Sequence, residues 1–258
     1  MTGPVKLSAT IITFNEERKI DRCLQSLQGI ADEIIVVDSF STDGTENICR
    51  KYGVIFIKNR FEGYVAQKNF AMRKTSFDHV LSLDADEALS EELKASILKI
   101  KVDWGKYDGY AFNRRNNYCG KWIRFCGWYP DRKIRLWDRR KGEWGGTDPH
   151  DQVIIKSKSV KKLAGDILHY AYFTIDEHLK QMYKFAEVAA RAKYKKGVKP
   201  IFFIHVILNP CFKFFRKYIL QLGFLDGYYG FVFCATTALL NFYKYLRLHE
   251  YHKRGIPE

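Results

Sequence analysis

The sequence predicts an open, doubly wound α/β sheet, and two patterns in its first hundred residues support this prediction. Short apolar runs typical of buried strands alternate with amphipathic segments typical of helices. Such alternation indicates parallel strands joined by crossover helices. In addition, Thr13, Asp38 and Asp84 stand at the carboxyl ends of three apolar runs. Because doubly wound sheets bind ligands at that edge, these residues mark a candidate site.

Each element follows from its local pattern. Four apolar runs are the predicted strands: residues 7–13, 32–38, 54–58 and 79–84. Four amphipathic or capped segments are the predicted helices: residues 16–29, 41–53, 64–74 and 90–101. Gly53 is typical of a C-terminal cap, and Ser90 is typical of an N-terminal cap. The order of these elements is the order of a parallel sheet with crossover helices.

The pattern changes from about residue 109, where aromatic residues, arginines and glycines become frequent. Short strands are predicted at 109–114 and 133–138, and a last strand at 166–172. A long helix at 174–197 follows, and Thr174 with Glu177 three residues later forms a capping box at its start. We interpret the region before this helix as one that shapes the substrate site beside the edge of the sheet.

Composition and charge narrow the choice of partners. The 258 residues are 47% hydrophobic, which excludes a disordered chain, and 43 Lys+Arg against 29 Asp+Glu give a net charge of +14. A charge of this size favours an anionic partner: nucleic acid, a phosphorylated substrate or an acidic membrane. The six cysteines form no C-x-x-C pair, which favours a reducing compartment over a zinc site or disulfide framework. No signal peptide is recognisable, so we expect a cytoplasmic protein.

The last sixty residues are rich in aromatic and aliphatic side chains, with basic clusters at Lys213/Arg216/Lys217 and Lys244/Arg247. The uninterrupted apolar run 228–240 is shorter than the ~20 residues that a spanning helix needs. Amphipathic helices lying in a membrane interface are the favoured interpretation, and a helical subdomain packed on the core is the alternative. We therefore predict an α/β domain at 1–172, which holds the candidate site, and a membrane-associating helical region at 173–258.

The stretch "DADE" at 84–87 is the sharpest candidate for chemistry. Alternate residues at a strand end point the same way, so the carboxylates of Asp84 and Asp86 can face one cation. Oxygen ligands of this kind suit Mg²⁺ or Mn²⁺. Taken alone, the "DADE" stretch is more typical of a solvated helix start, and Glu87 is interpreted as a helix-start acid.

Three ordered motifs favour the interpretation of "DADE" as a functional site. "ATIITFNEE" at 9–17, "IIVVDSFSTDGT" at 34–45 and "DHVLSLDADE" at 78–87 resemble the inverting nucleotide-sugar glycosyltransferases of family 2. The resemblance runs over about residues 7–170 and implies a GT-A fold, a mixed and mainly parallel sheet flanked by helices. The "FLDGYYGF" segment and the long helix before it are similar to the subgroup that adds glucose to the inner core of lipopolysaccharide.

The resemblance also implies roles for single residues. The first-strand segment that lines the nucleotide pocket corresponds to Thr13, Phe14, Asn15 and Glu16. Asp38 matches the acid that contacts uracil or ribose. Asp86 matches the main metal ligand, and Asp84 a second ligand nearer the ribose. Lys68 is either a donor contact or a solvated helix lysine.

The remaining site predictions concern the base and two further side-chain types. Asp151 occupies the position of the family's general base, with Asp148 as the competing candidate, and His150 either orients the base or helps to hold the diphosphate. His169 is either a ligand of the metal or diphosphate, or a buried hydrogen-bonded histidine. Four tryptophans either stack on sugars or belong to the core: Trp122, Trp128, Trp137 and Trp144.

The predicted activity is transfer of a hexose, glucose in particular, from a UDP-sugar to a lipid-linked acceptor such as the lipopolysaccharide core, with Mn²⁺ or Mg²⁺. We expect the enzyme on the inner face of the cell membrane, without a nucleic-acid partner. A sugar-nucleotide pyrophosphorylase is the alternative enzyme, but "TFNEERK" at 13–19 lacks the glycine-rich phosphate loop of that class. A basic nucleic-acid-binding protein is the other alternative, although no base-reading motif supports it.

Overall fold

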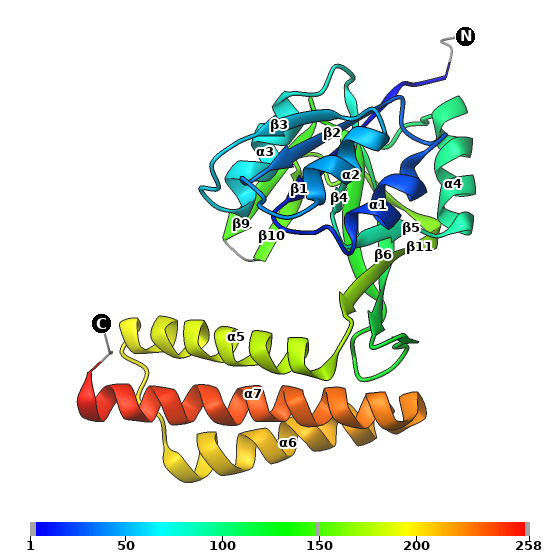
Figure 1. Ribbon diagram of the computed structural model, residues 1–258. Helices are drawn as coiled ribbons and strands as arrows, with labels where there is room; N and C mark the ends of the chain where they lie inside the picture. The colour runs from blue at the N-terminus through cyan, green and yellow to red at the C-terminus, as the bar shows by residue number, and fades with distance from the viewer. Residues whose placement is uncertain (1–3, 148–149, 256–258) are drawn as a thin grey trace. The chain divides into compact units, whose positions relative to one another are not determined.

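The computed structural model describes residues 4–147 and 150–255, which form two compact units. The first unit comprises the chain up to Arg115 together with Asp131–Tyr170. The second comprises Asn116–Pro130 and the chain from Ala171 onward. Figure 1 shows a sheet flanked by helices in the first unit and a stack of long helices in the second. The predicted functional division at residue 172 stays a prediction.

The strands and helices of the first unit follow the predicted order. Its strands are β1 (Leu7–Thr13), β2 (Glu33–Asp38), β3 (Ile55–Lys58), β4 (His79–Asp84), β5 (Glu87–Leu89), β6 (Gly109–Tyr118), β8 (Asp131–Asp138), β9 (Gly142–Thr147), β10 (His150–Ile155) and β11 (Val160–Tyr172), of which β6 and β11 continue into the second unit. Its helices are α1 (Ile20–Leu27), α2 (Thr45–Lys51), α3 (Tyr64–Arg73) and α4 (Glu91–Val102). The four predicted strands and four predicted helices are thus confirmed to within a few residues at most ends.

A mixed sheet organises this part of the fold. Among the described residues it has nine strands in the order β3-β2-β1-β4-β8-β6-β11-β5, with β7 (Lys121–Trp122) paired to β6. The strands β3, β2, β1 and β4 run parallel, and β8 joins β4 antiparallel. In the ladder, Thr13 stands opposite Asp38 and Ile12 opposite Asp84. The three predicted strand ends therefore meet at one edge, and the predicted fold class is confirmed.

The core explains why these segments fold as they do. The apolar residues of α1 recur at helical spacing, and Ile20, Cys23, Leu24 and Leu27 are buried against the sheet. Burial of each leucine stabilises the fold by about 1.5–3 kcal/mol. Ser90 caps α4, because its Oγ accepts a hydrogen bond from the Leu93 N–H at 3.2 Å.

The sequence pattern underestimates the antiparallel strands. The segments predicted at 109–114 and 166–172 belong to the longer strands β6 and β11. The added residues, 115–118 and 160–165, include adjacent charged and amide side chains such as Asn116 and Lys162, so these segments lack the apolar alternation that would indicate a strand. The pair β9 and β10 forms a separate two-stranded sheet whose glycine-rich sequence hides it for the same reason.

The second unit is a set of long helices. Its elements are α5 (Ile175–Lys195), η1 (Phe202–Leu208), α6 (Asn209–Phe215), η2 (Arg216–Leu220), η3 (Gly223–Asp226) and α7 (Gly227–Arg254). The predicted cap of α5 is confirmed: the Glu177 N–H donates to Thr174 Oγ1 at 3.1 Å, and Glu177 Oε2 accepts from the Phe173 N–H at 2.8 Å. Helices α5 and α6 both pack on α7 (Figure 1). None of the described helices is long and apolar enough to span a membrane.

The "FLDGYYGF" segment has a structural role in this unit. The buried Asp226 carboxylate accepts hydrogen bonds from the backbone N–H groups of Arg124 and Phe125, at 3.1 and 2.8 Å. Gly230 allows a close backbone approach, because a Cβ at this position would stand 2.1 Å from the Gly223 carbonyl oxygen. The motif therefore fixes the start of α7 against the loop 116–130.

Candidate functional site

The loops after β1 and β2 are tied together at the strand ends. The fully buried Asp38 accepts hydrogen bonds from the Ser41 N–H at 2.8 Å and from Ser41 Oγ. Asn15, which adopts a φ of +54°, donates its N–H to Ser41 Oγ and accepts from the Thr42 N–H, both at 2.8 Å. Asn15 is tolerated in this left-handed conformation better than most residues. These bonds preorganise the edge at which a nucleotide is expected.

The other predicted nucleotide-side residues present different surfaces. Thr13 is buried, and its Oγ1 has no hydrogen-bond partner among the described residues. Phe14 is 57% exposed and is free to stack on a planar ring. Glu16 lies 3.4 Å from the Lys19 ammonium. Burial raises the pKa of Glu16, Lys19 opposes this, and the neighbouring Asp86 adds to it.

Asp84 is held between two buried cations. Its Oδ1 lies 2.7 Å from Lys68 Nζ, and its Oδ2 lies 2.7 Å from Arg135 Nη2. Burial alone would raise the pKa of Asp84, but Arg135 and Lys68 outweigh it and hold that pKa well below its usual value. Both carboxylate oxygens therefore already have charged partners.

Glu87 is not a helix-start acid, and that interpretation is wrong. It begins strand β5, which pairs with β11 at the end of the strand order, and its side chain is 1% exposed. Its Oε1 lies 2.9 Å from Arg135 Nη2 and 3.3 Å from Arg114 Nη1. Its Oε2 accepts a hydrogen bond from the Asp84 N–H at 3.0 Å. Glu87 thus compensates the guanidinium charges buried beneath the site.

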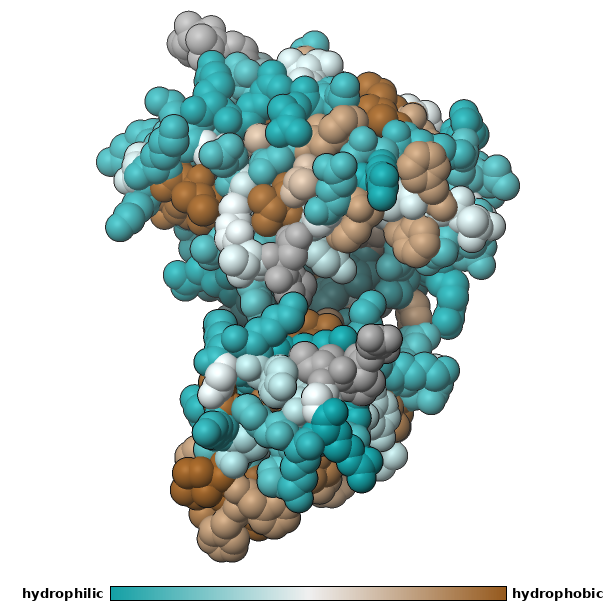
Figure 2. Space-filling model, turned by 90° about the vertical axis from the view of Figure 1, so that its left-hand side faces the viewer, coloured by the Kyte–Doolittle hydropathy of each residue, from teal (hydrophilic) through white to brown (hydrophobic). Residues whose placement is uncertain are grey.

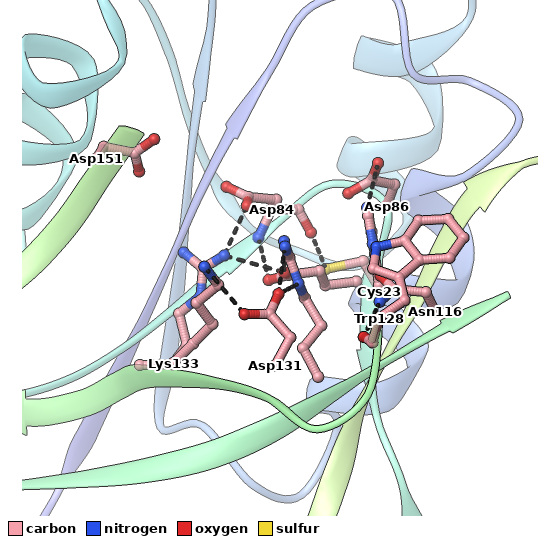
Figure 3. Close-up of polar contacts among 12 residues, drawn as sticks. Cys23, Asp84, Asp86, Asn116, Trp128, Asp131, Lys133 and Asp151 are labelled. Carbon is pink, nitrogen blue, oxygen red and sulfur yellow. Dashed lines mark hydrogen bonds and ion pairs between the residues drawn. The ribbon is translucent and has the colours of Figure 1, made fainter. Parts of the chain in front are cut away.

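Lys68 joins two of the predicted site residues. It projects from α3, is 3% exposed, and places its Nζ 2.7 Å from both Asp84 Oδ1 and Asp151 Oδ2. The alternative of a solvated helix lysine is therefore wrong. Asp151 lies on β10 (Figure 3). The competing acid, Asp148, lies outside the described residues, while the adjacent His150 is exposed at the start of β10.

Asp86 has partners of a different kind (Figure 3). Its Oδ2 lies 3.3 Å from His169 Nε2, on β11, and 3.8 Å from Lys19 Nζ. Burial acts to raise the pKa of Asp86, but His169 and Lys19 outweigh it and leave that pKa lowered. One carboxylate oxygen and one imidazole nitrogen thus stand side by side at the strand-end edge.

The donor chemistry fits a divalent cation at Asp86 and His169. Two ligands on neighbouring corners of an octahedron with bonds of ~2.1 Å stand ~3 Å apart, close to the observed 3.3 Å. The described residues contain no cluster of three or more His, Cys, Asp or Glu ligands, so most of the coordination would come from water and phosphate oxygens, as Mg²⁺ sites commonly arrange. Both oxygens of Asp84 pair with Lys68 and Arg135 in this structure, and its role as a second ligand stays a prediction.

A cavity of about 690 Å³ adjoins Asp84 and Asp151 on the side of β8 and β10. Trp144 lines it, and Lys68 Nζ lies 4.3 Å from the centre of a Trp144 ring. Trp137 is fully buried in the core, so the core alternative holds for this residue. In the second unit, Trp128 stacks on Phe233 at 4.1 Å and Trp122 lies on β7.

Sequence reasoning missed Arg135. This residue is 3% exposed and contacts Asp84 and Glu87. Burial acts to lower the pKa of Arg135, but the two carboxylates outweigh burial and raise that pKa. A signal was present: Arg135 interrupts the apolar residues of "KIRLWD", and a buried cation requires buried acids. The sequence could not say which acids, since Asp84 and Glu87 lie about fifty residues earlier in the chain.

This chain matches a protein-family model and is similar to several known proteins. The family model described as "Glycosyl transferase family 2" matches residues 8–163. The lipopolysaccharide core biosynthesis glycosyltransferase LpsC of Rhizobium meliloti is 28% identical over 98% of this chain and 95% of that protein. The uncharacterized glycosyltransferase RT0209 of Rickettsia typhi is 30% identical over 95% of this chain and 87% of that protein. The S. aureus TarS 1–349 crystal structure with UDP superposes with a TM-score of 0.48 and 16% identity, covering 97% of this chain and 92% of that one.

Proposed function

Because the chain belongs to glycosyl transferase family 2, we propose that it transfers a hexose, glucose in particular, from a UDP-sugar to a lipid-linked acceptor such as the lipopolysaccharide core. The observation that carries this proposal is the meeting of the β1, β2 and β4 ends beside the linked Asp84, Lys68 and Asp151. The name of the LpsC relative supports the choice of acceptor. The same membership places the chain with the transferases and not with the pyrophosphorylases.

The nucleotide is assigned to the edge formed by β1 and β2. Phe14 packs on the base, while the buried carboxylate of Asp38 holds Ser41 and with it the loop that meets the nucleoside. Thr13 is likewise buried, at the end of β1. The loop bonds of Asn15 to Ser41 and Thr42 hold this edge in place before the donor arrives. A preformed edge of this kind lowers the conformational entropy lost on binding.

Asp86 and His169 would hold Mn²⁺ or Mg²⁺, which supplies positive charge to the diphosphate leaving group when bound. Glu16 and Lys19 stand next to Asp86 and set the charge around it. Asp84 acts differently from Asp86, because it positions Lys68 and Arg135. The two acids of the "DADE" motif thus have separate tasks.

Asp151 is assigned as the general base. In the transfer, its carboxylate takes the proton of the acceptor hydroxyl, the hydroxyl oxygen bonds to the anomeric carbon, and the bond from that carbon to the nucleoside diphosphate breaks. A single displacement of this kind inverts the configuration at the anomeric carbon. Lys68 fixes the direction of the Asp151 carboxylate through a 2.7 Å contact, which serves the alignment that the displacement needs.

The transfer activity is tested by a turnover screen. Purified protein is mixed with Mn²⁺ or Mg²⁺ and a panel of UDP- and GDP-sugars, and release of free nucleoside diphosphate is measured with and without a lipopolysaccharide core acceptor. We expect UDP-glucose to be the preferred donor and the acceptor to accelerate release. Pyrophosphate-dependent release of UTP, with no sugar transfer, would contradict the proposal and favour a pyrophosphorylase.

The segment 202–220 is the proposed membrane-binding face. It contains η1, α6 and η2, and it exposes large apolar side chains: Phe202, Phe203, Ile204, Ile207, Leu208, Phe212, Phe215, Ile219 and Leu220. Figure 2 shows hydrophobic surface gathered where α6 lies in Figure 1. Exposed apolar surface of this extent is typical of an interaction site.

Charge indicates an anionic lipid surface as the partner of this face. Lys213 and Arg216 are exposed within the segment and form no ion pair with a described residue. Other members of the predicted basic clusters are used internally: Lys217 Nζ donates to the Cys126 carbonyl at 2.7 Å, and Arg247 pairs with Glu187 at 2.9 Å. Anionic headgroups attract such cations, and the apolar side chains gain from insertion. We therefore propose the inner face of the cell membrane as the location of the enzyme.

Vesicle sedimentation tests the membrane-binding face. We expect the protein to sediment with vesicles that contain phosphatidylglycerol and to bind pure phosphatidylcholine less strongly. Phe203→Ser with Leu220→Ser should release it, whereas Ile55→Ser with Phe61→Ser, at exposed positions of the first unit, should not. Equal binding of both double variants would contradict this assignment.

A further inference from the structure

The cavity beside Asp151 carries more positive than negative charge. Its lining cations are Arg114, Arg132, Lys133, Arg135 and Lys162. With Lys68 they make six positive charges among the described side chains, against four carboxylates that lie on or pair with them: Asp84, Glu87, Asp131 and Asp151. Two positive charges therefore remain in excess at this wall.

The excess charge resides on identifiable side chains. Arg132 and Lys162 line the cavity, and neither forms an ion pair with any side chain in the described ranges. Deeper in the wall, Arg135 Nε and Nη1 and Trp144 Nε1 are buried without a hydrogen-bond partner among the described residues. A buried donor left without an acceptor is destabilising, because it has given up its hydrogen bonds to water. The wall is thus rich in cationic donors that lack acceptors.

The position of the cavity in the fold indicates which of the two substrates it receives. Thr13 and Asp38 lie at the ends of β1 and β2, whereas the cavity is lined by β6, β8 and β11, which lie beyond β4 in the strand order, and by β10 of the separate two-stranded sheet. Asp151, the proposed base, lines the cavity, so a hydroxyl that gives up its proton to Asp151 must lie in it. The cavity therefore faces the acceptor, and the nucleotide edge is separate from it.

We propose that the acceptor is an anionic sugar, whose phosphate or carboxylate binds Arg132, Lys162 and the wall around Arg135 while its neighbouring hydroxyl meets Asp151. This inference rests on the proposed function, which supplies the role of Asp151. Arg132 and Lys162 are exposed and meet the anion from the solvent side, whereas Arg135, which is 3% exposed, supplies the part of the attraction that water screens least. The anionic group then selects the acceptor and sets the orientation of the reacting hydroxyl.

The test measures binding of acceptor fragments without turnover. Tryptophan fluorescence, with Trp144 in the cavity wall, is followed during titration with glucose 6-phosphate, with glucuronate and with neutral methyl glucoside. We expect the anionic sugars to bind at least about tenfold more tightly than methyl glucoside, since their charged group forms charge-assisted hydrogen bonds that the neutral sugar lacks. The stronger of the two anions identifies phosphate or carboxylate as the natural group.

A charge-matched pair of variants localises the binding. Arg132→Gln with Lys162→Gln should weaken binding of the preferred anion about tenfold or more. Arg50→Gln with Lys51→Gln removes the same charge on α2, outside the cavity lining, and should leave binding unchanged. Circular dichroism confirms that both variants are folded. Equal binding of neutral and anionic sugars, or equal effects of the two double variants, would overturn the inference.

Titration with UDP and Mn²⁺ separates this inference from the proposed function. We expect Arg132→Gln with Lys162→Gln to bind UDP as tightly as the unmodified protein. Competition between UDP and the anionic sugar would show that the cavity is the diphosphate site and would overturn the inference. If the unmodified protein binds anionic sugars here but fails to bind any nucleotide, the proposed function fails, and the anion site itself stands.

Discussion

The substitution Glu87→Gln removes one negative charge from the buried network under the site and keeps the shape of the side chain. Glu87 is 1% exposed, and its Oε1 lies 2.9 Å from Arg135 Nη2 and 3.3 Å from Arg114 Nη1. Loss of one partner from a buried ion pair costs about 3–5 kcal/mol, because the opposite charge stays buried. Asp84 still pairs with Arg135 and Asp131 with Arg114, so we expect the lower end, about 3 kcal/mol.

Urea and thermal unfolding measure this effect. A loss of about 3 kcal/mol corresponds to a fall in Tm of about 6–12 °C for a unit of this size. Glu91→Gln is the matched control, because Glu91 is exposed on α4 and pairs only at the surface with Lys94 at 2.8 Å. That change should cost less than about 0.5 kcal/mol. If the Glu87→Gln and Glu91→Gln variants unfold alike, the reasoning about the buried network is refuted.

Three further predictions concern other parts of the molecule. Burial lowers the pKa of His178 from 6.5 to about 4, so the neutral ring contributes up to about 3 kcal/mol of stability, which is present above pH ~6.5 and is lost as the pH falls toward 4. The variant His178→Phe should flatten the pH dependence of the free energy of unfolding in that window, and an unchanged slope would argue against this reasoning. Lys68→Met should lower kcat/KM about 10- to 100-fold with little change in UDP affinity, because the loss of the Lys68 ammonium leaves the Asp151 carboxylate free to rotate. An equal loss of UDP affinity would instead show that Lys68 contacts the donor. Gly165→Ala should destabilise the fold more than Gly53→Ala, because a Cβ at Gly165 would stand 2.3 Å from the Leu93 nitrogen. Gly53→Ala should cost about 1 kcal/mol, since Gly53 has a φ of +64° and no atom within 4 Å of an added Cβ. Similar denaturation midpoints of the two variants would disprove the close contact at Gly165.

The parallel half of the fold could be predicted because each strand is a continuous apolar run that ends in a polar residue. Leu7–Thr13 and His79–Asp84 match the predicted bounds, and the ladder places their ends together. The strands β9 and β10 could not be predicted in the same way, because glycines and charged residues replace the apolar alternation there. In that part of the chain the long-range contacts with α3, not local propensity, determine the structure.

Some residues of the candidate site could be predicted from local sequence patterns, and others could not. Thr13, Asp38, Asp84 and Asp86 could be found because strand ends are visible in the sequence. The ion pairs of Glu87 with Arg135 and of Lys68 with Asp151 link segments 48 and 83 residues apart, so no local pattern records them. A lone buried cation in a strand signals that an acid is near, but only the fold says which one.

A calorimetric titration of UDP in the presence of Mn²⁺ tests the central claim, a nucleotide-sugar site at the strand ends, most directly. We predict that the unmodified protein binds UDP in a Mn²⁺-dependent manner and that Asp86→Ala abolishes this dependence, because Asp86 and His169 offer the metal its carboxylate and imidazole ligands. Asp176→Ala, on the exposed face of α5, should bind like the unmodified protein. Unchanged metal-dependent affinity in Asp86→Ala would contradict the site assignment.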